Sequence, residues 1–229
     1  MIFIGIDPGL GGGIAAVDSD GDVSLVADAP TVTTYVKNKK REEFDLPEMG
    51  RILHGIVAKS GGQTLAQIER VGTMPEQGIS SAFNFGKGYG FWIGMLVANF
   101  IRYEEVHPLT WKKAMLSGMG SKGQGANKKV PSMLKAQQLF PKYAHLLFSE
   151  WRGKRYPKDG RAEALLMAEH SRQRHFGLMR VTEVPARKRR AIKADVATDV
   201  NRAEAEGLQA KDDAVRAEDT ISKKDGGNQ

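Results

Sequence analysis

The sequence predicts an α/β domain followed by a charged tail. Short β-branched and apolar runs predict strands, and longer stretches with apolar residues at helical spacing predict helices between the later strands. The chain has 229 residues, enough for one core of about 100 to 200 residues and an extension. It contains no cysteine, which excludes a disulfide framework or a thiolate metal site and leads us to expect a reducing, cytoplasmic location.

The first eighteen residues predict a strand, a tight turn and a second strand. The apolar residues 2–6 end at Asp7, which opens a Pro-Gly turn, and apolar residues resume at 13–17. Charged side chains are seldom buried unless they are paired or bind a metal, so a carboxylate directly after a central strand suggests a site. Alternatively, Asp7 caps the turn by accepting a hydrogen bond from a backbone amide. The motif alone leaves both interpretations open.

Two more strands and a helix are expected before residue 70. Residues 23–27 predict the third strand of a meander, and the polar, basic residues 31–44 lead into a helix over residues 49–57. Residues 64–69 then predict a short strand whose last residue is Glu69. A second strand that ends in a carboxylate repeats the pattern seen at Asp7.

The second half of the chain predicts further helices and one more strand. The helices cover residues 80–102, a short segment from Pro108, residues 133–140 and residues 159–170, and the strand covers residues 103–106. The longest apolar stretch is too short to span a bilayer, so we expect no membrane segment.

The long helix over residues 80–102 carries a stripe of small residues. These recur every four residues and line one face: Gly86, Gly90, Gly94 and Ala98. Glycine inside a helix costs about 1 kcal/mol relative to alanine, so the stripe favours close approach of another backbone. That backbone belongs either to the protein's own sheet or to a partner helix related by a two-fold axis. Because the bulky residues lie largely off the stripe, we predict a homodimer.

The last predicted helix begins with two carboxylates on one face, Asp159 and Glu163. Like charges four residues apart repel each other by a few tenths of a kcal/mol on an isolated helix, so this pair favours a cation between them. In the alternative interpretation Asp159 is the N-cap and Glu163 faces water.

The four acids are expected to converge. If the first strand is central and adjacent to the fourth, Asp7 and Glu69 leave the sheet at one edge, where a helix docked across the sheet can present Asp159 and Glu163. An all-oxygen group of this kind suits Mg²⁺, with Mn²⁺ able to substitute. Two such ions per site, about 3.5 to 4 Å apart, catalyse in-line displacement at a phosphodiester. The arrangement therefore predicts a metal-dependent nuclease.

The charge balance predicts an acidic partner such as nucleic acid. The formal net charge is +7, although a basic balance also fits a merely solvated surface. Two segments offer basic residues for phosphate contacts, the second with aromatic residues interleaved: Lys122, Lys128 and Lys129, then Arg152, Lys154 and Arg155. Residues 181–229 are densely charged and poor in apolar residues, which predicts a disordered or solvated helical tail.

The acidic motifs, in their order along the chain, resemble the RuvC-type Holliday junction resolvases of the ribonuclease H-like superfamily, in particular the divergent bacteriophage forms. Residues 4–9 are similar to the family's opening strand motif, residues 68–69 to its second acidic strand and residues 159–166 to its closing acidic helix. The likeness covers residues 1–175. Sugar kinases and actin-like ATPases share the opening motif, whereas the three acidic elements together are more specific.

This resemblance implies a mixed five-stranded sheet flanked by helices, with the first three strands antiparallel, in a domain over residues 1–180. It also implies a homodimer that nicks Holliday junctions or other branched DNA with magnesium, in the host cytoplasm if the gene is a phage gene. The cellular enzymes usually carry two Asp three residues apart in the closing helix, so it stays open whether Asp159 or Glu163 is the primary ligand. They also place a junction-probing aromatic after the second acid; Phe83 and Phe85 are candidates here, although core packing suits either better.

Two other functions compete with the nuclease. An actin-like ATP-dependent kinase would use the glycine-rich turn after Asp7 as a phosphate loop, but the sequence shows no second strand-turn-strand of this type after residue 100. A non-catalytic branched-DNA-binding module of the same fold would make the order of the four acids a coincidence.

Overall fold

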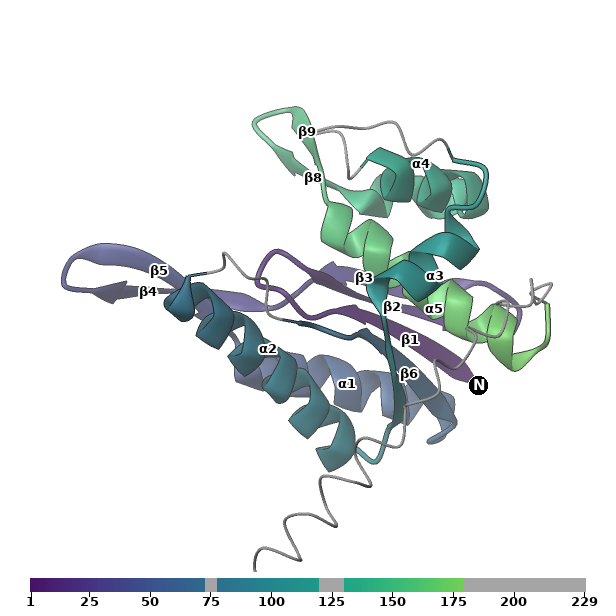
Figure 1. The fold of residues 1–229 in the computed structure, drawn as a ribbon, viewed down its shortest axis with the longest axis horizontal. Helices are drawn as coiled ribbons and strands as arrows, with labels where there is room; N and C mark the ends of the chain where they lie inside the picture. Colours follow the sequence, from purple (N-terminus) through teal and green to yellow (C-terminus); the bar gives the residue numbers. More distant parts are fainter. Residues whose placement is uncertain (73–77, 120–129, 179–229) are drawn as a thin grey trace, which may run out of the picture. The chain divides into compact units, whose positions relative to one another are not determined.

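A computed structural model describes residues 1–72, 78–119 and 130–178, and its centre is a mixed five-stranded sheet in the order β3-β2-β1-β6-β7 (Figure 1). The strands are β1 (Ile2–Asp7), β2 (Gly13–Asp18), β3 (Val23–Asp28), β6 (Thr64–Glu69) and β7 (Arg102–Val106). β1, β2 and β3 pair antiparallel, whereas β6 pairs parallel to β1 and β7 parallel to β6. The predicted mixed five-stranded sheet, with its first three strands antiparallel, is therefore confirmed.

Alternation along the strands divides the core into two layers. Ile4 and Ile6 of β1 point to the face covered by α1 (Leu46–Ser60) and α2 (Ile79–Ala98). The opposite face is covered by α3 (Pro108–Met115), α4 (Val130–Leu139) and α5 (Asp159–His175). Asp7 follows this alternation: it projects to the α5 side, as Gly5 does. Figure 1 shows the two helical layers on either side of the sheet. Asp7 is therefore on the face that α5 covers, the face on which Gly5 meets Ala164.

Helix α5 lies directly against the backbone of β1 and of the β1–β2 turn. A Cβ added at Gly5 would overlap the carbonyl oxygen of Ala164 and lie 2.5 Å from the amide nitrogen of Ala168. A Cβ at Gly13 would lie 2.8 Å from the carbonyl oxygen of Gly160. Real Cβ atoms do not approach backbone atoms so closely, so glycine at these positions permits the docking of α5.

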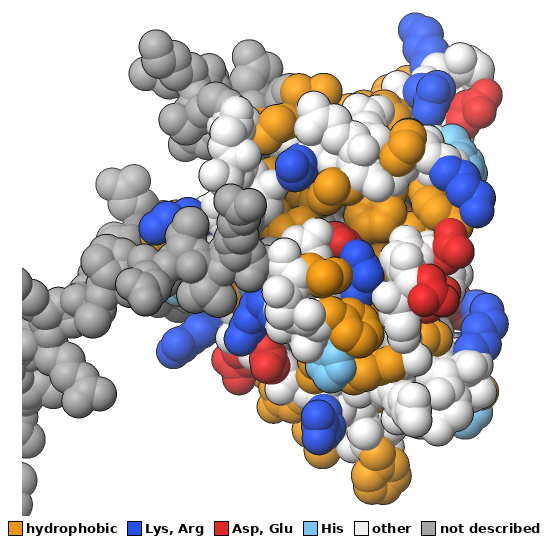
Figure 2. Space-filling view, turned by 90° about the vertical axis from the view of Figure 1, so that its right-hand side faces the viewer, with side chains coloured by type: hydrophobic (Ala, Val, Ile, Leu, Met, Phe, Trp, Pro, Cys, Tyr) orange, Lys and Arg blue, Asp and Glu red, His pale blue; other side chains and the backbone are white. Residues whose placement is uncertain are grey.

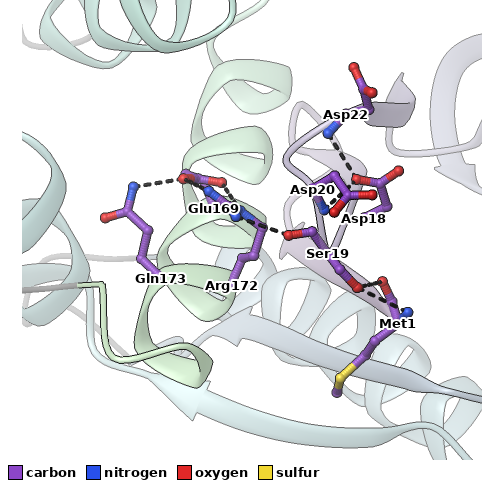
Figure 3. Close-up of polar contacts among 8 residues, drawn as sticks. All are labelled: Met1, Asp18, Ser19, Asp20, Asp22, Glu169, Arg172 and Gln173. Atoms are coloured by element: carbon purple, nitrogen blue, oxygen red, sulfur yellow. Dashed lines mark hydrogen bonds and ion pairs between the residues drawn. The ribbon is translucent and has the colours of Figure 1, made fainter.

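Hydrogen bonds hold the C-terminal half of α5 against the β2–β3 turn, at the end of the sheet where β1 begins (Figure 3). Arg172 donates two hydrogen bonds to the Glu169 carboxylate, both 2.8 Å long, and one of 3.1 Å to the Ser19 carbonyl oxygen. Gln173 donates to the same Glu169 carboxylate at 2.7 Å. Ser19 lies in the β2–β3 turn, so glycine contacts at one end of α5 and this polar cluster at the other hold the helix across the sheet.

A buried polar pair links the middle of α5 to β6. His170 is 2% exposed, and its Nδ1 lies 2.8 Å from the Oε1 of the fully buried Gln67. Burial, together with the nearby charge of Arg174, lowers the pKa of His170 to about 4. The imidazole is therefore neutral at physiological pH and acts as a hydrogen-bonding partner in the core.

Two β-hairpins extend the described domain beyond the sheet and helices. β4 (Thr31–Val36) and β5 (Lys39–Phe44) form the first, closed by Lys37 and Asn38 at φ of 49° and 60°. Positive φ at both loop residues matches the turn type favoured in two-residue hairpins. β8 (Phe148–Trp151) and β9 (Lys154–Pro157) form the second, immediately before α5. The polar composition of residues 31–44 concealed the first hairpin from sequence analysis, because a ribbon exposed on both faces shows no apolar alternation.

The glycine stripe of α2 faces away from the sheet. Trp92 and Leu96 of this helix are fully buried in the core, whereas a Cβ added at Gly86, Gly90 or Gly94 would meet nothing within 4 Å. The stripe is therefore not a contact with the protein's own sheet. No helix among the described residues combines the length and apolar character needed to cross a bilayer.

Candidate active site

The carboxyl ends of the three parallel strands meet at one edge of the sheet, and the candidate site lies there. Ile6 of β1 pairs with Ile68 of β6. The next residues, Asp7 and Glu69, therefore lie side by side at the ends of neighbouring strands. Glu69 in turn pairs with Val106, the last residue of β7. Open α/β sheets bind their ligands at this kind of edge.

Glu163 approaches these two acids from α5, because this helix packs across β1. It lies one helical turn after Asp159, next to Ala164, whose carbonyl oxygen packs on Gly5. The Glu163 side chain is only 14% exposed, and its carboxylate accepts a hydrogen bond of 3.2 Å from Ser132 of α4. Repulsion from both Glu163 and Glu69 acts on Asp7, so the structure brings the three acids together.

A cation that sequence analysis missed lies among the acids. Lys112 of α3 places its Nζ 3.0 Å from one oxygen of Glu163 and 3.9 Å from Oε1 of Glu69. Its neighbour Trp111 is fully buried and donates an indole hydrogen bond of 2.9 Å to the same oxygen of Glu69. The sheet topology explains this position: α3 follows β7, which is parallel to β6, so α3 starts at the edge where the acids meet.

Burial and mutual repulsion make the acid cluster electrostatically strained. Burial, with the negative charges of Glu163 and Glu69, raises the pKa of Asp7 to about 7. A weak hydrogen bond from the Gly9 amide, 3.5 Å long, and the charge of Lys112 oppose this rise. Burial also raises the pKa of Glu69, although Trp111 and Lys112 counteract part of the effect. Strongly perturbed carboxylates in one cluster are typical of functional sites.

The two interpretations of Asp7 are thus both present in the structure. The Gly9 amide does contact its carboxylate, as a turn cap would. A cap alone, however, accounts neither for its burial nor for its position beside two other carboxylates. These features favour a ligand-binding role.

The chemistry of the cluster fits a divalent cation. Carboxylate oxygens are the donors that Mg²⁺ and Mn²⁺ prefer, and a divalent cation would relieve the repulsion that raises the pKa of Asp7. Within residues 1–72, 78–119 and 130–178, no three acidic or histidine side chains are gathered closely enough to hold an ion as they stand. The Lys112 ammonium instead neutralises part of the charge between Glu69 and Glu163.

Asp159 is the first residue of α5 and is half-buried. The N-cap residue is Lys158, so the interpretation of Asp159 as the N-cap is wrong by one position. The first turn of α5 is held in place by Arg161, which donates to both oxygens of Asp28 at 2.7 and 3.0 Å. Burial alone would raise the pKa of Asp28, but the hydrogen bonds from Arg161 and Lys158 outweigh it and hold that pKa below its ordinary value.

The predicted DNA-binding residues are described in part. Arg152, Lys154 and Arg155 lie in the β8–β9 hairpin and are exposed, and the guanidinium of Arg152 stacks 4.4 Å from the ring centre of Trp151. This hairpin leads directly into the first turn of α5, the helix that carries Asp159 and Glu163. Lys122, Lys128, Lys129 and the predicted tail lie outside the described residues.

A groove runs beside the acid cluster. It is lined by the β1–β2 turn, the first turns of α2 and the base of the β4–β5 hairpin, with Gly9, Asn84 and Phe44 among its residues. Phe83, one turn into α2, is 70% exposed, so the core-packing interpretation of this residue is wrong. Phe85 is half-buried and approaches Gly9.

No family model matches the chain, and no curated protein matches it. Among solved structures, RuvC from Thermus thermophilus is similar at 14% identity and a TM-score of 0.46, over 78% of this chain and 98% of that one. T. thermophilus RuvC in complex with a Holliday junction substrate is similar at 12% identity and a TM-score of 0.47, with the same coverage.

Proposed function

We propose that this protein is a magnesium-dependent endonuclease that nicks Holliday junctions or other branched DNA. The observation that carries the proposal is the acid cluster of Asp7, Glu69 and Glu163 at the carboxyl edge of the sheet, where the pKa of Asp7 is raised to about 7. Burying three carboxylates together is costly unless their charges are compensated, and the Lys112 ammonium carries only one positive charge against three. The order of the acidic motifs along the chain, which resembles that of RuvC-type resolvases, supports the same function.

Each residue of the site has a distinct role in this proposal. Asp7, Glu69 and Glu163, with Asp159 one turn before Glu163, would hold two magnesium ions. Bound magnesium supplies charge stabilisation and an activated water for phosphodiester hydrolysis. Trp111 orients the Glu69 carboxylate through its indole hydrogen bond. Lys112 limits repulsion among the acids and offers a half-exposed ammonium to a phosphate oxygen.

DNA contacts are proposed for two sets of basic residues. Arg152, Lys154 and Arg155 on the β8–β9 hairpin, and Lys122, Lys128 and Lys129, are assigned to phosphates. The exposed Phe83 beside the groove is available to stack on an unpaired base at a branch point.

We expect the purified protein to cut a synthetic four-way junction in the presence of Mg²⁺ or Mn²⁺ and to leave it intact in excess EDTA. Gel analysis of end-labelled junctions measures the cutting, and linear duplex of the same sequence controls for unspecific nuclease activity. Equal cutting in EDTA would refute the metal requirement. Tight junction binding without cutting under every metal condition would instead identify a non-catalytic binding module.

The structure favours the nuclease over the kinase. In an actin-like kinase the glycines after Asp7 would leave backbone amides open to a nucleotide phosphate. Here a Cβ added at Gly13 would lie 2.8 Å from the carbonyl oxygen of Gly160, and a Cβ added at Gly160 would lie 2.5 Å from the carbonyl carbon of Gly12. These two glycines of the turn therefore serve the docking of α5.

We further propose that the active form is a homodimer whose subunits meet through α2. The stripe of Gly86, Gly90 and Gly94 is open to solvent, and the exposed Phe83 and Val97 extend it at helical spacing. Small residues between exposed apolar ones allow two helices to approach closely. Two active sites related by a two-fold axis would also suit the paired cuts that resolve a junction.

Replacing Gly90 by leucine should yield a folded monomer, because a Cβ there meets nothing within the subunit but would block a partner helix. Analytical ultracentrifugation measures the mass, and supercoiled cruciform plasmid distinguishes single nicks from paired cuts. Gly55→Leu in α1 is a matched control, since a Cβ there also meets nothing within 4 Å. A Gly90→Leu protein that stays dimeric and makes paired cuts would contradict the α2 interface.

A further inference from the structure

Neither the acid cluster nor the predicted phosphate contacts involve the β4–β5 hairpin, which is the largest exposed feature among the described residues without a role. Five of the six residues in each of its strands are exposed. An isolated two-stranded ribbon is at best marginally stable in water. A ribbon exposed on both faces adds little to the core of its own domain, which favours a role in binding another molecule.

The charge of the hairpin is unevenly distributed along its length. Four cations lie at and near the tip: Lys37, Lys39, Lys40 and Arg41. Glu42 and Glu43 lie nearer the base, where Lys40 approaches Glu42 at 3.8 Å. Lys39 and Lys40 are consecutive on β5, so their side chains project to opposite faces of the ribbon. Both faces of the tip thus present positive charge.

The hairpin starts at the edge of the sheet that carries the acids. Asp28 at the end of β3 is paired with Gly13, which is in turn paired with Asp7. β4 begins three residues after Asp28, and in Figure 1 the ribbon extends outward from this edge. The base is fastened by Phe44, whose ring packs on Gly88 and lies 6.2 Å from the ring of Phe91 in α2. The arm is thus anchored beside the candidate active site.

The space between the arm and the acids is a groove rather than packed core. One hollow is lined by Arg41 to Phe44 of the hairpin together with Leu10, Asn84 and Lys87. The adjoining hollow shares Leu10, Asn84 and Phe44 and continues to Gly9, whose amide contacts Asp7. Together the two hollows extend from the β1–β2 turn, next to Asp7, to the base of the hairpin.

We propose that the β4–β5 hairpin is a DNA-binding arm that holds the phosphates of one duplex arm of the substrate, away from the cleaved bond. This inference rests on the proposed nuclease function. A two-stranded ribbon fits the major groove of B-DNA, which has phosphates on both walls. Cations on both faces of the tip match that distribution of negative charge.

The size of the arm sets where it contacts DNA. Six extended residues span about 20 Å, and successive base pairs rise about 3.4 Å, so the tip contacts phosphates roughly six base pairs from the acid edge. Figure 2 shows the side of the described domain that is opposite the arm in Figure 1. On this side, basic side chains are interspersed with acidic and apolar ones. The clustered cations of the hairpin tip differ from that mixed surface.

The test compares Lys39→Gln/Lys40→Gln with the wild type on junctions whose loop-closed arms have about four or about twelve base pairs. Binding is measured against salt concentration in EDTA, so that it does not depend on cutting. Lys59→Gln/Arg102→Gln is the matched control, because these exposed cations lie at the opposite edge of the sheet, next to the starts of β6 and β7. Circular dichroism and thermal unfolding verify that each variant is folded.

On long arms the hairpin variant should flatten the slope of log affinity against log salt by about 1.8, since each lost phosphate contact removes about 0.9. On short arms the hairpin variant should have the same slope as the wild type. The control variant should have the wild-type slope on long and on short arms. An unchanged slope on long arms, an equal change on short arms, or no DNA binding by the wild type would overturn the assignment. Magnesium-dependent cutting of the short-armed junction tests the nuclease separately, because that substrate does not reach the hairpin tip.

Discussion

Asp7→Asn should abolish magnesium-dependent cutting and at the same time stabilise the metal-free protein. Replacing groups that merely support a metal ligand typically costs about 10- to 100-fold in affinity or activity, so loss of a ligand charge should lower the cutting rate by more than about 100-fold. Junction binding should persist because the substitution preserves the size of the side chain. Single-turnover cutting and gel-shift binding measure the two quantities.

The expected gain in stability follows from the raised pKa of Asp7, which burial, Glu163 and Glu69 raise to about 7. At pH 8 the wild-type carboxylate is ionised in an unfavourable environment. Removing its charge should increase the free energy of unfolding by about 4 kcal/mol, since the pKa rises from 3.8 to about 7 and each unit of pKa corresponds to about 1.4 kcal/mol. Urea unfolding in EDTA measures the gain. Added magnesium should then stabilise the wild type but not the variant, because only the wild type retains the full site.

Asp20→Asn is the matched control for this experiment. Asp20 is an exposed carboxylate in the β2–β3 turn, at the opposite edge of the sheet from Asp7. Its replacement should leave cutting and unfolding close to wild-type values. If Asp7→Asn instead lowers stability in EDTA, Asp7 is a structural turn cap and the metal-site assignment fails.

Gly5→Ala should be the most destabilising single methyl group that can be added to the described domain. The new Cβ would overlap the carbonyl oxygen of Ala164 and lie 2.5 Å from the Ala168 amide nitrogen, so α5 has to move as a body. Overpacking a core lowers the free energy of unfolding by about 1–3 kcal/mol and occasionally more. Because the new Cβ meets backbone atoms, which cannot rotate away as a flexible side chain can, the loss for this variant should be about 3 kcal/mol or more. Because Glu163 moves with α5, cutting should fall as well, by about 100-fold for a displacement of about 1 Å.

The comparison that isolates this effect is Gly55→Ala in α1. A Cβ at Gly55 meets nothing within 4 Å, and alanine is favoured over glycine in a helix by about 1 kcal/mol. Thermal unfolding should therefore shift in opposite directions for the same chemical change at two glycines. A Gly5→Ala protein with wild-type stability would show that α5 does not rest on β1 as described.

Much of the fold follows from local sequence because its signals are local. The apolar run before Asp7, the glycine-rich turn and the strand ending at Glu69 each specify an element within a few residues. The family resemblance of these motifs implied a mixed five-stranded sheet whose first three strands are antiparallel, and the structure confirms this arrangement. The stripe of Gly86, Gly90 and Gly94 was also visible, but spacing alone could not decide between the sheet and the solvent. The structure decided it, because Trp92 and Leu96 occupy the core and turn the glycines outward.

Long-range contacts decided the composition of the candidate site. Lys112 and Glu163 are separated by fifty-one positions, and nothing local to either shows that their charged groups lie 3.0 Å apart. The raised pKa of Asp7 likewise arises from burial under α5, which depends on backbone packing at Gly5 rather than on the residues around Asp7 in sequence. The sequence by itself thus determined which acids end the strands. Tertiary packing determined which charges surround them, because burial and repulsion act through space.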